Sequence, residues 1–138
     1  MSDCKARPLA CETALRGLRE TIAVQSAQIP LQNGIFVGAE DRSRASMAAC
    51  RLLMSCESLT ADLRTAISAL ASNGCVEQCE RWRLFYEQTV TAFFVRFEAA
   101  ADLVGNGEGC NPTLLISLCR DFCESADLFL KKETDISR

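Results

Sequence analysis

Hydrophobic residues recur along the chain at alternating intervals of three and four positions, the spacing that places side chains on one face of an α-helix. The first such stripe predicts a helix over residues 9–29. Pro8 suits a first helical turn, whereas Pro30 cannot continue the helix and disfavours helical geometry at the residue before it. The stripe consists of Cys11, Leu15, Leu18, Ile22, Gln25 and Ile29.

Two further stripes predict helices over residues 43–72 and 75–104, separated only by the turn signal Asn73-Gly74. The inward positions of the second helix are Ala49, Leu52, Cys56, Leu59, Leu63, Ala66 and Leu70. Those of the third helix are Cys75, Cys79, Trp82, Tyr86, Val90, Phe93, Phe97, Ala100 and Val104. The third predicted helix, on and off this stripe, carries most of the aromatic side chains.

A fourth helix is predicted over residues 112–131, because Asn111 is a good N-cap and Pro112 suits the first helical position. Its stripe is Leu115, Leu118, Phe122, Ala126 and Phe129. The polar tail, residues 132–138, is expected to be flexible. Four helices with two short connections predict a single all-α domain over residues 1–138, a four-helix bundle with antiparallel up-down-up-down order.

Two apolar features exceed what the core of such a bundle requires. The connection after the first helix contains three successive apolar residues, which either fold over the end of the core or form an exposed docking site. The third helix is apolar outside its stripe as well, and this extra face must be covered by that loop or by a second chain. The predicted interaction residues are Ile35, Phe36, Val37, Phe85, Phe94 and Val95.

Charge and composition exclude several classes of partner. Lys and Arg number 15 against 18 Asp and Glu, a net charge of −3, so the chain lacks the basic surface that nucleic-acid binding requires. It has no polybasic run, no leader-like start and no stretch near the ~20 apolar residues that span a bilayer. We therefore expect a cytoplasmic protein that binds neither nucleic acid nor membrane.

Histidine is absent, which removes the usual general base of hydrolases and the imidazole ligand of most catalytic zinc sites. We therefore expect no catalytic residues and no organic cofactor. A cysteine nucleophile would need a different base, and the sequence indicates none.

Nine cysteines leave three interpretations open: packing as small apolar side chains, disulfides between helices, or a soft-metal site. Two pairs, Cys75/Cys79 and Cys119/Cys123, have the i, i+4 spacing that puts both sulfurs on one helix face. Together these four cysteines are the candidate ligands for Cu(I) or Zn(II). Their spacing resembles that of the cysteine-lined four-helix copper-storage proteins, which have more cysteines and usually contain histidine.

The sequence thus supports two main hypotheses about function. The first is a non-enzymatic helical bundle that acts by protein–protein interaction, with a homodimer or another protein as the partner. The alternative is a cytosolic bundle that binds copper or zinc through cysteine thiolates. A third hypothesis, a cavity for a small apolar ligand, would require space among Trp82, Phe93, Phe97, Phe122 and Phe129.

Overall fold

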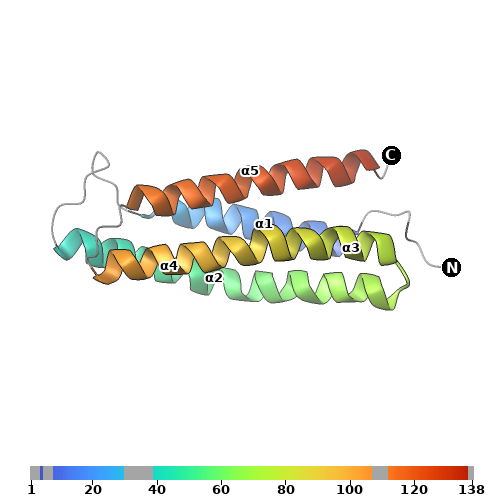
Figure 1. The fold of residues 1–138 in the computed structure, drawn as a ribbon, viewed down its shortest axis with the longest axis horizontal. Helices are drawn as coiled ribbons and strands as arrows, with labels where there is room; N and C mark the ends of the chain where they lie inside the picture. The colour runs from blue at the N-terminus through green and yellow to red at the C-terminus, as the bar shows by residue number, and fades with distance from the viewer. Residues whose placement is uncertain (1–3, 5–7, 30–38, 107–111, 137–138) are drawn as a thin grey trace.

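The structure is a computed structural model of the chain, and it describes residues 4, 8–29, 39–106 and 112–136. Helices account for almost all of these residues, and the described parts of the chain contain no strand. They form the all-α four-helix bundle that the hydrophobic stripes predict (Figure 1).

Each stripe corresponds to one helix of the bundle. The third helix is continuous but includes a π-helical segment, η1, between its two α-helical parts. The bounds are α1 Leu9–Ser26, α2 Ala39–Ser72, α3 Val76–Phe85, η1 Tyr86–Thr91, α4 Ala92–Asn106 and α5 Pro112–Ile136. In Figure 1, successive helices run in opposite directions along the long axis.

The core runs along the whole length between the helices. Its largest fully buried apolar side chains come from all four helices: Leu15, Leu18, Ile22, Leu52, Leu63, Trp82, Val90, Phe97, Val104 and Leu115. These are inward positions of the sequence stripes. Burial of an apolar side chain of this size contributes about 1.5–3 kcal/mol, so the stripe residues supply the main favourable term in folding.

Helix α1 ends three residues before the predicted boundary. The backbone N–H groups of Gln28 and Ile29 donate to the carbonyls of Gln25 and Ser26, each three residues earlier, at 3.0 and 3.2 Å. This tightening of the last turn is common where α-helices end. It leaves Ile29 buried at 4% exposure although it lies outside the helix.

The fourth helix continues five residues beyond its predicted end, to Ile136. The expectation of a flexible tail from residue 132 is therefore wrong for residues 132–136, while 137 and 138 lie outside the described residues. Glu133 is the cause, because its side chain is only 2% exposed and contacts the third helix.

The π-helical segment η1 determines which residues face the core in the two halves of the third helix. Phe85 and Val90 are both buried although five positions separate them. An interval of five matches the i to i+5 hydrogen bonding of a π-helix, whereas a regular α-helix would rotate one of these residues away from the core. The extra residue in η1 thus allows Phe85 and Val90 to face the core together.

Aromatic side chains fill the layers on either side of η1. The ring of Phe129 packs edge-on to Trp82 at 4.7 Å and stacks on Phe85 at 4.2 Å. Further along, Phe93 lies 5.0 Å from Phe122. These contacts occupy the region considered as a cavity for a small apolar ligand, and they argue against one there.

Candidate interaction surface

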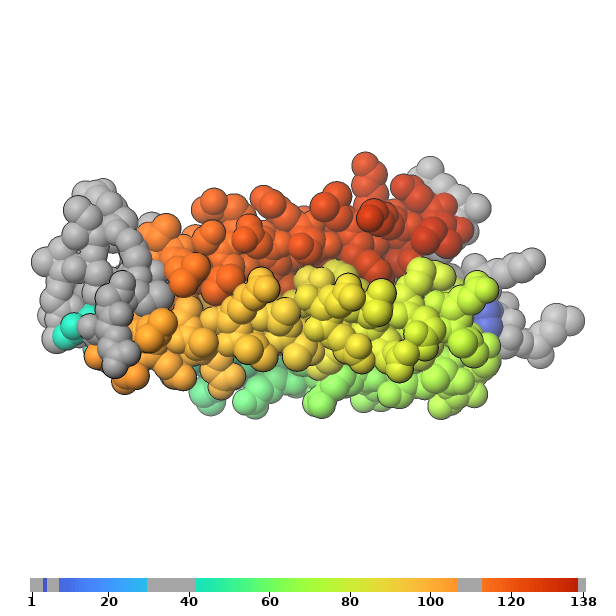
Figure 2. Space-filling model, in the orientation of Figure 1, coloured from blue at the N-terminus to red at the C-terminus, as the bar shows by residue number. Residues whose placement is uncertain are grey.

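A groove lined by both apolar and polar side chains runs between α2 and the η1–α4 part of the third helix. Figure 2 shows this part of the third helix, coloured yellow to orange, between α5 and α2. The volume of the groove is about 570 Å³. Helix α2 contributes Leu53, Cys56, Glu57, Thr60 and Arg64, and the opposite wall is formed by Tyr86, Thr91, Phe94, Val95 and Glu98. The two ends of the π-helical segment, Tyr86 and Thr91, therefore both line this α2–α4 groove.

Apolar side chains line both walls of the α2–α4 groove. Val95 on α4 is 63% exposed, and Leu53 on α2 is half-buried. Phe94 is half-buried, and its ring is held edge-on against the core residue Phe93 at 5.0 Å. Single exposed apolar residues are common, but several around one groove favour a binding surface.

Opposite charges occupy different positions along the groove. Arg64 interacts electrostatically with Tyr86. Burial raises the pKa of Tyr86 above its ordinary value, and Arg64 offsets part of that rise. Glu57 precedes Arg64 by two helical turns on α2. Because α4 runs opposite to α2, Glu98 also lies toward the Glu57 end. Within the described residues, none of these three charges forms an ion pair with another side chain.

The structure brings together only part of the predicted interaction set. Phe94 and Val95 line the groove, as just described. Phe85 does not, because η1 shifts the register and turns its ring inward onto Phe129, leaving it 8% exposed. Ile35, Phe36 and Val37 lie outside the described residues. The sequence analysis did not identify Leu53 as an interaction residue. Leu53 directly follows Leu52, and Leu52 already fills the inward position of the stripe there.

The four predicted metal ligands fall into two separate groups. Cys75 forms a disulfide with Cys4 at the end of the bundle where α3 begins, with Cys79 one turn further along. Cys119 is buried in α5, and Cys123 donates a weak hydrogen bond to the carbonyl of Arg19, 3.7 Å away. In the described parts of the chain, no three His, Cys, Asp or Glu residues are arranged to hold a metal ion.

Burial also suppresses the thiolate form of several cysteines. It raises the pKa of Cys11, Cys56 and Cys119 from 9.0 to about 12 in each case. A cysteine binds metal as the thiolate, so these three side chains are poor ligands at neutral pH. Their environment favours the interpretation in which they pack as small apolar residues.

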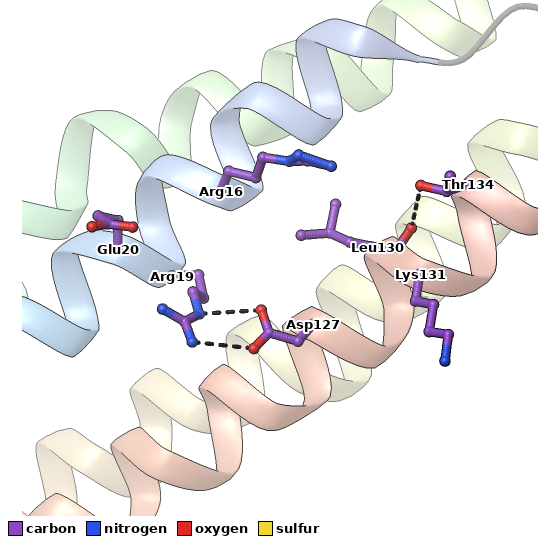
Figure 3. A pocket seen from close by; sticks show the side chains of 7 residues that line it. All are labelled: Arg16, Arg19, Glu20, Asp127, Leu130, Lys131 and Thr134. Carbon is purple, nitrogen blue, oxygen red and sulfur yellow. Dashed lines mark hydrogen bonds and ion pairs between the residues drawn. The ribbon is translucent and has the colours of Figure 1, made fainter.

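A second, polar pocket lies between α1 and α5 (Figure 3). Its arginines already have carboxylate partners. Arg19 binds Asp127 through two hydrogen bonds of 3.1 Å, and Arg16 lies 3.6 Å from Glu12. Both arginines are therefore paired, and Lys131 is the third cation that lines the pocket.

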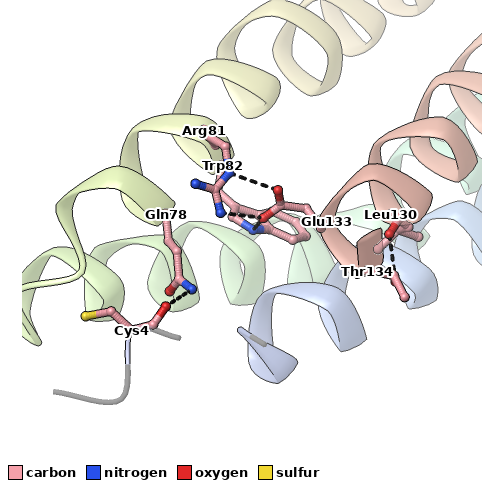
Figure 4. A network of polar contacts seen from close by, with 7 residues as sticks. All are labelled: Cys4, Gln78, Arg81, Trp82, Leu130, Glu133 and Thr134. Atoms are coloured by element: carbon pink, nitrogen blue, oxygen red, sulfur yellow. Dashed lines mark hydrogen bonds and ion pairs between the residues drawn. The ribbon is translucent and has the colours of Figure 1, made fainter. Parts of the chain in front are cut away.

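A buried carboxylate joins α5 to α3 near the same end of the bundle as the disulfide (Figure 4). Glu133 accepts a hydrogen bond from the indole Nε1 of Trp82 at 2.8 Å and from Nε of Arg81 at 2.9 Å. A buried charge requires such partners to offset its desolvation. Both carboxylate oxygens of Glu133 are therefore engaged with the third helix, which is a structural role.

Comparison with known protein families, with curated proteins and with solved structures gives no match. No helix in the described part of the chain is long and apolar enough to cross a membrane. The function must therefore be inferred from the surfaces of this bundle alone.

Proposed function

We propose that this protein is a non-enzymatic, cytoplasmic helical bundle that acts by self-association, with a second copy of the chain bound across the α2–α4 groove. The observation that carries the proposal is the combination of partly exposed apolar side chains with opposite charges at different points along one groove. A C2 dimer requires a surface that complements itself, and this arrangement has that property.

The spacing of the charges defines the pairing. Glu57 and Arg64 are seven residues apart on α2, about 10 Å at ~1.5 Å per residue. With a twofold axis midway between them, each Arg64 faces Glu57 of the second copy. Val95 and Leu53, which line the groove, then lie in the region between the two copies.

The apolar and charged groups have different roles in this dimer. An exposed ion pair contributes only about 0.2–1 kcal/mol, so the charges fix the register and orientation. Burial of Val95 and of the exposed parts of Leu53 and Phe94 supplies most of the affinity. The absence of histidine throughout the chain is consistent with a function that needs no acid–base catalysis.

A charge-reversal cycle tests the proposal, with sedimentation velocity of the reduced protein as the readout. We expect a dimer for the wild type, and at least tenfold weaker association for Arg64→Glu and for Glu57→Arg, because each reversal places like charges opposite each other twice. The double variant restores opposite charges and should recover most of the affinity.

The matched control is Arg120→Glu, which reverses an exposed arginine on α5, away from the groove. It should leave the dimer unchanged. A wild-type protein that stays monomeric at several hundred micromolar overturns the proposal. So does a double variant no tighter than either single variant, because the two charges would then not meet across an interface.

A further inference from the structure

Four cysteines gather at the end of the bundle where α1 begins and α2 turns into α3. Cys4 and Cys75 form the disulfide, Cys79 lies one turn along α3, and the thiol of Cys11 interacts electrostatically with Cys79. The disulfide joins positions 71 residues apart. It therefore fastens residue 4 to the tight turn that contains Gly74.

The turn and the start of α3 place Cys75 in a defined position. Gly74 has φ of +78°, the left-handed conformation that glycine readily adopts, and the N–H of Cys75 donates to the carbonyl of Leu70 at 2.9 Å. Cys75 is the N-cap residue of α3. The side chain of Gln78 also donates a hydrogen bond to the carbonyl of Cys4, as Figure 4 shows.

The two sulfurs of the disulfide differ in access and in chemistry. Cys4 is half-buried, whereas Cys75 is 6% exposed. A thiolate that attacks from solvent reaches Cys4 more easily. Cys75 stands at a helix N-terminus, where the partial positive charge of the helix favours a thiolate and so makes Cys75 the better leaving group.

We propose that this disulfide is a thiol–disulfide exchange site for small cellular thiols of the glutathione class, and that exchange begins at Cys4. The first thiolate attacks Sγ of Cys4, a mixed disulfide forms, and the Cys4–Cys75 bond breaks with its electron pair on Sγ of Cys75. A second thiolate attacks the sulfur of the bound small thiol and releases Cys4.

The net reaction is balanced. One protein disulfide becomes two protein thiols, two small thiols become one small-molecule disulfide, and their two protons pass to Cys4 and Cys75. Buried Cys11 takes no part, because burial raises its pKa to about 12 and keeps it protonated. The exchange also accounts for a disulfide in a protein proposed to be cytoplasmic, where disulfides are mostly transient.

The test follows the oxidised protein in mixtures of glutathione and glutathione disulfide, with acid quenching and peptide mass spectrometry. We expect the native disulfide to open and close reversibly as the mixture changes, with the transient glutathione adduct on Cys4. In quenched samples of the wild type, the glutathione adduct should be at least tenfold more abundant on Cys4 than on Cys75.

Cys50→Ser is the control, because Cys50 is an exposed thiol on α2 that the exchange does not use. It should behave as the wild type does. An adduct found mainly on Cys75 overturns the proposed order of attack. A disulfide that resists 10 mM glutathione unless urea is added shows a purely structural cross-link and overturns the exchange site. Neither result depends on whether the α2–α4 groove forms a dimer.

Discussion

Replacement of Glu133 tests whether one buried carboxylate anchors the end of α5. Its side chain is 2% exposed and accepts hydrogen bonds from Trp82 at 2.8 Å and from Arg81 at 2.9 and 3.3 Å. Glu133→Gln preserves the shape but removes the charge. The new amide has one carbonyl oxygen as its acceptor, and its NH2 group would face the N–H groups of Arg81 or Trp82.

The expected cost of Glu133→Gln is about 2 kcal/mol. A hydrogen bond to a charged group contributes about 1.5–3 kcal/mol, and the lower part of that range applies because the Arg81 side chain is 34% exposed and can be rehydrated. Glu133→Ala should cost more, about 3–4 kcal/mol, because the buried indole N–H of Trp82 then loses its acceptor as well.

Urea unfolding measures this change in the free energy of unfolding. Circular dichroism and the fluorescence of Trp82, the single tryptophan of the chain, monitor the transition. In a domain of this size, 2 kcal/mol corresponds to a fall in Tm of about 5–8 °C. Glu124→Gln, an exposed substitution on the same helix, is the control and should change stability by less than ~0.5 kcal/mol. An equally small effect for Glu133→Gln would refute the reasoning.

Three further predictions concern the backbone and the buried thiols. Gly74→Ala should destabilise the protein by about 1 kcal/mol in thermal unfolding, because φ is +78° while no atom lies within 4 Å of the added Cβ. Gly17→Ala should stabilise by about 0.5 kcal/mol, less than the ~1 kcal/mol helix propensity, because the new Cβ would lie 3.1 Å from Cδ2 of Leu59 and that flexible side chain must shift. Burial raises the pKa of Cys56 from 9.0 to about 12, so the folded state holds a proton that the unfolded state loses, and the free energy of unfolding should fall as pH rises above 9. Cys56→Ala should make that fall shallower in urea titrations, and an unchanged slope would contradict the assignment.

The helices could be predicted because each one carries a long apolar stripe. The inward positions Leu15, Leu52, Phe97 and Leu115 are all fully buried in the structure. Periodicity alone could not locate the end of α5, because Glu133 looks like a solvent-facing charge until Trp82, 51 positions earlier, is placed beside it. Interactions between distant positions of this kind leave no local signal.

The candidate interaction surface was predictable only where a regular helix was a good approximation. Phe94 and Val95 follow η1, and both reach the groove. Phe85 directly precedes η1, and its ring turns inward because η1 contains an extra residue. The sequence does not reveal this extra residue, so the inward position of Phe85 was not predicted. Cys4 could not be paired with Cys75 from the sequence, since nine cysteines allow many pairings.

The π-helical segment offers a way to separate the fold from the proposed interaction. A π-helical segment contains one residue more than the corresponding α-helix, so deletion of exposed Gln88 should convert η1 into a regular turn. Phe85 and Val90 would then be four positions apart, an interval that α-helices bury readily. The Gln88 deletion should therefore keep the helical content and a Tm close to that of the wild type.

The groove should respond differently from the core, because Tyr86 and Thr91 stand at the two ends of η1 and both line it. With one residue removed, these walls shift and the dimer should weaken at least tenfold in sedimentation. Deletion of exposed Ala99 is the contrasting control, since it lies in regular α4 and rotates Val104 out of the core. If the Gln88 deletion unfolds the protein as readily as the Ala99 deletion does, η1 is required by the core itself. If it folds and dimerises normally, the walls of this groove do not form the interface.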